Sequence, residues 1–307
     1  TPSATESGAG TPISLTLGIV QGQDFVHALP ALTAVEQGFF TKEGLTVTVV
    51  NFTSGSDLTK AMAGGSVNVG AATGLDAVSA AAHSVGLKSF YGIEGPSPMT
   101  LIVPAKSSIT SFADLKGKKV GISAFGSMTD FVVRSTAAKE KVAITDIKEV
   151  PLGAPSSVLA ALGRGDVDGI ILPVYFGYQM EAAGTGKIAE SASKVLGSND
   201  QFAQLMASSA YISANSTALK RLAAAYTDSL NYMKSHKDDA VALAVSKLNM
   251  SNPIAITSYD ALIGNFTPGG KLNAAGLAAY AKALPDLGIA TSVPKASDYL
   301  STAIVGK

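Results

Sequence analysis

Residues 13–52 read ISLTLGIVQGQDFVHALPALTAVEQGFFTKEGLTVTVVNF. Two apolar runs rich in β-branched residues, Ile13–Val20 and Leu45–Phe52, are typical of buried strands. Between them, Ala28–Gln37 has the composition of a helix and is followed by Gly38, a residue that commonly ends helices. A strand, a helix and a second strand of these lengths predict a βαβ unit with a right-handed crossover. This stretch therefore places the chain in the α/β class with a parallel sheet.

The same alternation continues outward from this unit. The next four expected elements are a helix at 57–63, a strand at 67–71, a helix at 75–83 and a strand at 88–93. A second cycle of strands and helices then runs from residue 100 to residue 172, and a strand-like run follows at 205–212. The remainder predicts four helices, at 217–235, 237–248, 254–264 and 273–284. Two α/β units followed by a helical tail are the expected organisation.

Composition excludes several classes of function. The chain has 307 residues, enough for two lobes, and Lys plus Arg equals Asp plus Glu at 23 each. Without a basic excess, no nucleic-acid partner is expected. No Cys is present, which rules out thiolate catalysis, disulfides and iron–sulfur or Cys–zinc sites. The three His residues are scattered, so neither a metal nor a cofactor is predicted.

The first eleven residues, TPSATESGAGT, are small and polar. They predict a flexible N-terminal tether of a processed, exported chain, either periplasmic or on the cell surface. In a lipoprotein the anchoring Cys would lie just upstream, and such an anchor is the only membrane attachment we expect. A trimmed terminus is the alternative interpretation.

Three loops combine a strand end with a helix start and hydroxyl side chains. They contribute Ser54 and Ser56, then Thr73, then Ser127 and Thr129. Strand ends in open α/β sheets face a crevice, and helix N-termini offer free N–H donors there. Such loops suit an acceptor-rich or anionic ligand. Helix capping alone, with the acidic residues of the loops as caps, is the competing explanation.

Other candidate contacts lie in neighbouring loops. The first loop brings together Gln23, Asp24, Phe25 and His27, a mixture of polar groups and one ring that suits a small-molecule site. Elsewhere, the aromatic candidates are Phe125 and Tyr175, with Tyr178 assigned to packing, and Glu94 is expected at a pocket rim or hinge. No catalytic motif accompanies these residues. Arg134 is close enough to its helix start to contact either a ligand or an acid.

Four ordered segments resemble one family. They are AVEQGFFTKEGL at 34–45, LTKAMAGGSVNVG at 58–70, SFADLKGKKVG at 111–121 and AALGRGDVDG at 160–169. In this order they are similar to the nitrate, sulfonate, taurine and thiamine-precursor binding proteins of ABC importers. His27 stands where the thiamine-precursor binders often carry a loop His. Their usual Trp is absent, because the chain has no Trp.

The resemblance implies a type II periplasmic-binding-protein fold, with two α/β lobes joined by two crossing strands and a ligand cleft between them. Lobe 1 is then discontinuous, comprising 12–101 and 207–307, and lobe 2 is 102–206. The implied function is non-catalytic: a monomer closes around one small molecule and delivers it to the permease subunits of an ABC importer, which a separate ATPase drives. A sulfonate, an aromatic carboxylate and a heterocycle are all expected ligand classes.

Two other functions remain open on sequence grounds. One is a cofactor-independent enzyme on the same fold, of the menaquinone-pathway type. The related yeast pyrimidine synthase uses a Cys-rich iron motif, which this chain lacks. The other is the sensor domain of a receptor or a transcriptional regulator.

Overall fold

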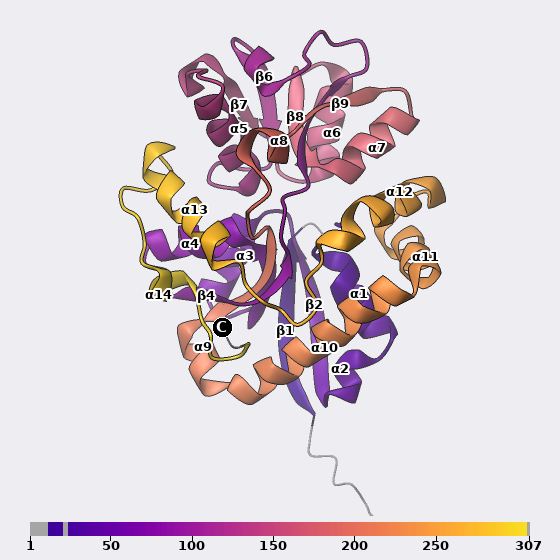
Figure 1. Cartoon of the computed structure of the whole chain (residues 1–307), viewed down its shortest axis with the longest axis vertical. Helices are drawn as coiled ribbons and strands as arrows, with labels where there is room; N and C mark the ends of the chain where they lie inside the picture. The colour runs from indigo at the N-terminus through magenta and orange to yellow at the C-terminus, as the bar shows by residue number, and fades with distance from the viewer. Residues whose placement is uncertain (1–11, 21–23, 306–307) are drawn as a thin grey trace, which may run out of the picture.

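The computed structural model describes residues 12–20 and 24–305 as two stacked lobes, each built around one five-stranded sheet (Figure 1). The predicted tether at 1–11 and the candidate Gln23 lie outside the described residues. The strands are β1 Ile13–Val20, β2 Leu45–Phe52, β3 Val69–Thr73, β4 Leu87–Glu94, β5 Met99–Pro104, β6 Lys119–Ile122, β7 Lys148–Pro151, β8 Gly169–Pro173, β9 Gly186–Ser191 and β10 Ala203–Ser208.

The first sheet has the strand order β2-β1-β3-β10-β4. Strands β1 and β2 pair in parallel from Ile13–Leu45 to Val20–Phe52, as the opening βαβ unit predicts. Strand β10 runs antiparallel to both neighbours, β3 and β4. The sheet is therefore mixed, and the expectation of a purely parallel sheet was wrong. The reason is that β10 enters from the other lobe rather than through a βαβ crossover.

The second sheet repeats this plan with the order β7-β6-β8-β5-β9. Strand β6 pairs in parallel with β7 and β8, whereas β5 runs antiparallel to β8 and β9. Strand β9 was not predicted from the sequence. Among the described strands, β10 is the one in the first sheet that enters directly from the opposite lobe, and β5 is the one in the second sheet.

The chain passes between the lobes in two places. Residues 95–98 connect β4 to β5, and residues 197–202 lead from the second sheet into β10 (Figure 1). The lobe bounds implied by the resemblance, after residues 101 and 206, fall inside strands β5 and β10. Backbone pairing instead assigns all of β5 to the second sheet and all of β10 to the first. The connections themselves carry no strand assignment.

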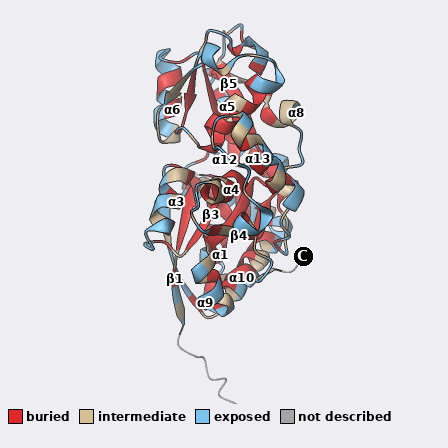
Figure 2. Ribbon diagram, turned by 90° about the vertical axis from the view of Figure 1, so that its left-hand side faces the viewer, coloured by how far each residue is buried: buried red, intermediate tan, exposed pale blue. Residues whose placement is uncertain are grey.

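Helices cover both sheets. The α-helices are α1 Ala28–Glu36, α2 Phe39–Lys42, α3 Gly55–Ala63, α4 Gly74–Ala82, α5 Met128–Lys139, α6 Pro155–Arg164, α7 Val174–Ala182, α8 Ala192–Leu196, α9 Ser209–Ala214, α10 Ser216–Ser235, α11 Lys237–Leu248, α12 Asn252–Leu262, α13 Ala274–Asp286 and α14 Ala296–Tyr299. After β10 the tail helices return to the first lobe, where α10 packs on α1 and α13 packs on α4. Figure 2 shows buried residues concentrated on the strands and inner helix faces of both lobes.

Two local predictions were wrong. The strand-like run at 205–212 changes to helix at Ser209, because the Ser208 hydroxyl accepts the backbone N–H of Tyr211 and caps α9. The segment after β8, interpreted as an aromatic loop, is helix α7, which begins immediately after Pro173. A Pro just before the first helical turn is compatible with a helix start, since it lacks the N–H that would go unbonded there.

Candidate functional site

A small cavity lies between the lobes, where loops at the carboxyl ends of strands from both sheets meet. Its volume is ≈ 30 Å³, enough for one or two water molecules in this conformation. First-lobe residues come from the loops after β1, β2 and β3, and second-lobe residues from those after β6 and β8. The lining residues are Val20, Asp24, His27, Ser54, Gly55, Thr73, Asp76, Met99, Ser123, Ser127, Met128, Thr129, Pro173 and Phe202.

Asp24 and His27 form a buried pair in the loop after β1. The His27 Nδ1 atom lies 2.8 Å from Asp24 Oδ2, and Asp24 Oδ1 accepts the backbone N–H groups of Val26 and His27. An ionised carboxylate only accepts hydrogen bonds, so Nδ1 carries the proton. The Nε2 atom of His27 is buried and has no partner among the described residues. In a neutral ring this nitrogen is a hydrogen-bond acceptor, and a donor group on a bound ligand would satisfy it.

Helices α3 and α4 begin at the cavity and are held by their own acids. The backbone N–H of Asp57 donates to the Ser54 hydroxyl, which in turn donates to the Asp57 carboxylate. Asp76 accepts both the backbone N–H and the hydroxyl of Thr73, at 2.9 and 2.7 Å. Burial raises the pKa of Asp76. These contacts confirm that Asp57 and Asp76 act as caps.

Gly55 allows the two helix starts to approach each other. A Cβ atom at this position would lie 2.0 Å from a carboxylate oxygen of Asp76, far inside van der Waals contact. Any larger residue would therefore push α3 away from α4 or displace the Asp76 carboxylate. The width of the cavity on the first-lobe side depends on this contact.

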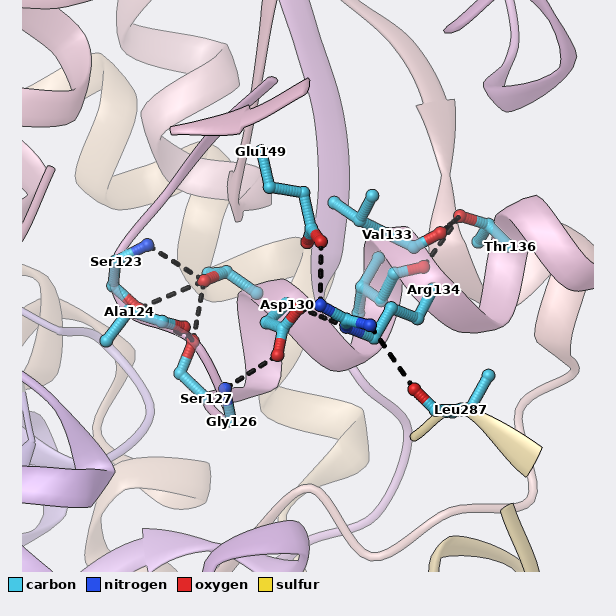
Figure 3. Close-up of polar contacts among 12 residues, drawn as sticks. Ser123, Ala124, Gly126, Ser127, Asp130, Val133, Arg134, Thr136, Glu149 and Leu287 are labelled. Carbon is cyan, nitrogen blue, oxygen red and sulfur yellow. Dashed lines mark hydrogen bonds and ion pairs between the residues drawn. The ribbon is translucent and has the colours of Figure 1, made fainter. Parts of the chain in front are cut away.

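The second-lobe wall is a cluster of hydroxyl groups at the start of α5 (Figure 3). The Ser123 hydroxyl lies 3.0 Å from those of both Ser127 and Thr129, and the backbone N–H of Ser123 donates to the Thr129 oxygen. The Asp130 carboxylate accepts the backbone N–H of Gly126 at 2.6 Å. Asp130 is therefore also a cap, so α3, α4 and α5 each have their own carboxylate at the cavity, whereas α7, which begins after the lining residue Pro173, has no acid in its first turn.

Arg134 points away from the cavity and holds α5 in place. Its guanidinium bonds Asp130 and Glu149 within the second lobe, and its Nη1 atom donates to the backbone carbonyl of Leu287 in the first lobe (Figure 3). Burial raises the pKa of Glu149 to about 8, and the nearby Asp130 contributes to the shift. Arg134 thus contacts two acids of its own lobe and a backbone carbonyl of the other lobe, and it does not line the cavity.

A second set of buried polar groups lies beside Asp24. Glu94, at the end of β4, is 0% exposed, and neither carboxylate oxygen has a partner among residues 12–20 and 24–305. Burial, followed by the charge of Asp24, raises the pKa of Glu94 well above its ordinary value. Tyr175 from the second lobe is also fully buried, and its hydroxyl has no partner among the residues that the structure describes. Burial, with Asp24 and Glu94 nearby, raises the pKa of Tyr175.

The structure brings six of the twelve predicted site residues to the cavity: Asp24, His27, Ser54, Thr73, Ser127 and Thr129. Five others do not line it. Phe25 is buried and packs against Phe266, Phe125 is 56% exposed, Ser56 is half-buried on α3, and Glu94 and Tyr175 lie behind Asp24. Gln23 is outside the described residues.

Several lining residues were not predicted to contact a ligand. Ser123 and Phe202 are the clearest cases, with Met99 and Met128 contributing apolar surface. Ser123 follows a strand directly, which is a usable sequence signal. Phe202 lies in the connection between the lobes, and its ring centroid is 5.4 Å from that of His27. No sequence pattern reports such a contact.

A larger cavity opens on another side of the lobe boundary. Its volume is ≈ 650 Å³, and it lies between α5, α13 and the connection around residues 192–200. Phe131 of α5 and Tyr280 of α13 meet edge-on nearby, with ring centroids 5.2 Å apart. Met128 lines both cavities.

The Asp24–His27 pair holds no nucleophile among the described residues. An Asp–His pair activates a nucleophile only when the nucleophile bonds the second ring nitrogen. No described hydroxyl bonds His27 Nε2. The described residues also contain no group of three or more potential metal ligands, and among them no helix is both long and apolar enough to cross a bilayer.

The amino-acid sequence is similar to a described protein family and to several known proteins. A family model described as "NMT1/THI5 like" matches residues 25–240. A putative aliphatic sulfonates-binding protein of Escherichia coli is 24% identical over 213 residues, covering 68% of this chain and 64% of that protein. The 4-amino-5-hydroxymethyl-2-methylpyrimidine phosphate synthase of Schizosaccharomyces pombe is 25% identical over 144 residues, covering 47% and 40%. The chain thus spans less than two thirds of the length of these relatives.

Among solved structures, the alkanesulfonate-binding protein SsuA from Xanthomonas axonopodis pv. citri bound to MOPS superposes with a TM-score of 0.80 at 18% identity. The superposition covers 94% of this chain and 96% of that one. At this identity the likeness establishes the fold. The predicted fold class, two α/β lobes of the periplasmic-binding type, is confirmed.

Proposed function

The chain belongs to the NMT1/THI5-like family, and from this premise we propose that it is the solute-binding protein of an ABC importer, exported from the cytoplasm. It binds one small organic molecule between its lobes and presents the closed form to permease subunits that a separate ATPase drives. The observation that carries this proposal is the cavity lined by polar loops from both lobes. A ligand that contacts both walls stabilises the closed arrangement over the open one.

The geometry supports a closing motion. Two short connections, 95–98 and 197–202, are the covalent links between the lobes, and hinge motion needs only a few such residues. The other inter-lobe contacts are non-covalent and include Arg134 with the Leu287 carbonyl, Phe131 with Tyr280, and the packing of α7 against α12. A cavity of ≈ 30 Å³ holds a head group and not a whole organic molecule, so entry requires the lobes to separate.

The ligand classes carried into this proposal are a sulfonate, an aromatic carboxylate and a heterocycle. The relatives are named for aliphatic sulfonates and for a pyrimidine phosphate, which supports a search among these compounds. A cofactor-independent enzyme on the same fold is the second candidate; one of the relatives is named as a synthase, although the chain lacks the Cys-rich motif of the yeast pyrimidine synthase.

A thermal-shift screen with product analysis separates the two candidates. Sulfonates, aromatic acids, heterocycles, nitrate and amines are each added at millimolar concentration, and hits are incubated and followed by NMR. A ligand at about 100 times its Kd stabilises the native state by about 2.7 kcal/mol, which moves Tm by a few degrees. A hit recovered unchanged supports the binding protein. Conversion of the hit supports the enzyme, and no stabilisation by any class contradicts the proposal.

A further inference from the structure

The electrostatic character of the small cavity narrows the ligand class. Its lining contains two carboxylates, Asp24 and Asp76, and no Lys or Arg. A third carboxylate, Glu94, lies behind Asp24, close enough for the Asp24 charge to act on it. The only other ionisable lining group is His27, which is already bonded to Asp24. A ligand in this cavity therefore meets negative or acceptor groups without a cationic side chain to balance them.

Three of the helix N-termini at the cavity are already compensated by acids and supply little positive charge. A free helix start attracts an anion through its dipole and its unbonded N–H groups. Here each of α3, α4 and α5 already has a carboxylate in its first turn, namely Asp57, Asp76 and Asp130. Each of these acids bonds a hydroxyl or backbone N–H at its own helix start. The dipoles of these three helices are thus largely compensated from within the protein. Helix α7, which starts after the lining residue Pro173, has no acid in its first turn and is the exception.

The unpartnered groups also favour a hydrogen-bond donor. His27 is 2% exposed and lines the cavity, and its Nε2 lone pair has no donor among the described residues. Both oxygens of the fully buried Glu94 are likewise unbonded in the described part of the chain. Leaving a buried acceptor without a donor costs free energy, and a buried charged one costs more. Such groups persist where a ligand supplies the partner.

We propose that the solute carries a basic nitrogen, an ammonium or amidinium type of group, whose N–H donors are held by His27, Asp24 and Asp76, with Glu94 supplying the nearest unpaired carboxylate. This inference rests on the proposed binding function and restricts its ligand. An ammonium nitrogen is about the size of a water molecule, so the ≈ 30 Å³ cavity matches the head group alone. Phe202, with its ring beside His27, adds an aromatic face that favours a cation.

The test uses matched compounds that differ only in charge. Benzamidine, benzamide and benzoate share a ring and differ in carrying a cation, an amide or an anion. Pentylamine, 1-pentanol and butanesulfonate form an aliphatic set. Titration calorimetry and thermal shift are carried out on the whole chain. We expect the amidine or the amine to bind at least about tenfold more tightly than its neutral and anionic counterparts.

The variant Glu94→Gln gives a second readout. It keeps the size of the side chain and removes the unpaired carboxylate, so the ligand-free protein should be at least as stable as the parent. The affinity for the cationic probe should fall at least about tenfold. Asp166→Asn, in an exposed pair with Arg164, is the matched control and should change neither property.

The outcomes separate the two proposals. Tighter binding of benzoate or butanesulfonate than of the cations overturns the basic-nitrogen inference and leaves the solute-binding function standing. Unchanged cation affinity in Glu94→Gln also overturns it. Absence of binding by every compound, here and in the wider screen, contradicts the binding function itself.

Discussion

The two cavities at the lobe boundary differ in almost every property. The larger, ≈ 650 Å³, is bordered by helices α5 and α13, and its apolar wall also contains charged side chains at its edges, namely Lys139, Asp200 and Asp286. The smaller, ≈ 30 Å³, combines apolar side chains such as Met99 and Phe202 with hydroxyls, two carboxylates and a histidine from loops of both lobes. If volume were the only criterion, the larger cavity would be taken as the ligand site.

The smaller cavity nevertheless has the features of a recognition site. It lies at the carboxyl ends of strands, where α/β proteins bind ligands. It also contains a buried histidine nitrogen with no donor in the described chain. The comparison teaches that unpaired polar groups on converging loops identify a site better than empty space does, since the space changes as the lobes move.

The largest expected effect comes from the pair that shapes the small cavity. Asp24→Ala removes the acceptor for His27 Nδ1 and for two backbone N–H groups. We expect a loss of about 2–4 kcal/mol in the free energy of unfolding, because buried donors are left unbonded. Urea titration measures it. The control Asp166→Ala, at an exposed acid, should lose less than about 0.5 kcal/mol, and equal losses would contradict the role of Asp24.

The next effect tests the close approach of α3 and α4. Gly55→Ala places a Cβ where the Asp76 carboxylate lies, so we expect a destabilisation of about 1–3 kcal/mol together with weaker solute binding. Gly163→Ala, in helix α6, meets no atom within 4 Å of the new Cβ and should stabilise the protein by up to about 1 kcal/mol. Equal stability of the two variants would show that the approach does not matter.

A smaller effect concerns the acid in the wall of the larger cavity. Burial raises the pKa of Asp200 from 3.8 to about 6. Between these two values the folded protein binds more protons than the unfolded chain, so this group lowers stability as pH rises from about 4 to 6. The partial exposure of Asp200 limits the cost to about 1–2 kcal/mol. Asp200→Asn should flatten this part of the stability profile measured by urea titration, and an unchanged profile would count against the assignment.

The smallest effect separates the cavities directly. Ala283→Phe adds a ring to the wall of the larger cavity, and we expect solute affinity to stay within about twofold and stability within about 0.5 kcal/mol. Ser127→Val alters the small cavity and should weaken binding at least about tenfold, since a hydroxyl is lost from its wall. Titration calorimetry with a solute from the screen measures both. If Ala283→Phe weakened solute binding more than Ser127→Val did, the larger cavity would be the ligand site.

Local patterns in the sequence predicted local structure well. Strands β1 and β2 begin and end as expected, because their β-branched runs are bounded by turn residues. The sequence did not show that β5 and β10 run antiparallel to their neighbours, since pairing direction depends on which lobe the chain comes from. Strand β9 was missed because GKIAES is short and only weakly alternating.

The site was predictable where a loop follows a strand and starts a helix. Ser54, Thr73 and Ser127 were found in this way. Phe25 and Phe125 also lie in loops that follow a strand and precede a helix. The Phe25 ring is nevertheless buried in the core and the Phe125 ring is exposed to solvent, because tertiary packing determines the orientation of each ring. The ionisable groups around Glu94 could not be predicted from the sequence, because its neighbours Asp24 and Tyr175 are distant in the chain.

Lobe closure around a solute is the central claim, and a distance between the lobes tests it most directly. Because the chain has no Cys, spin labels attach only at introduced positions, and Lys60→Cys with Lys116→Cys places one on each lobe at well-exposed sites. Pulsed electron spin resonance is recorded without solute and with a saturating solute from the screen. The account predicts a broad or longer distance distribution that narrows to one shorter distance on binding. An unchanged distribution with bound solute would contradict it.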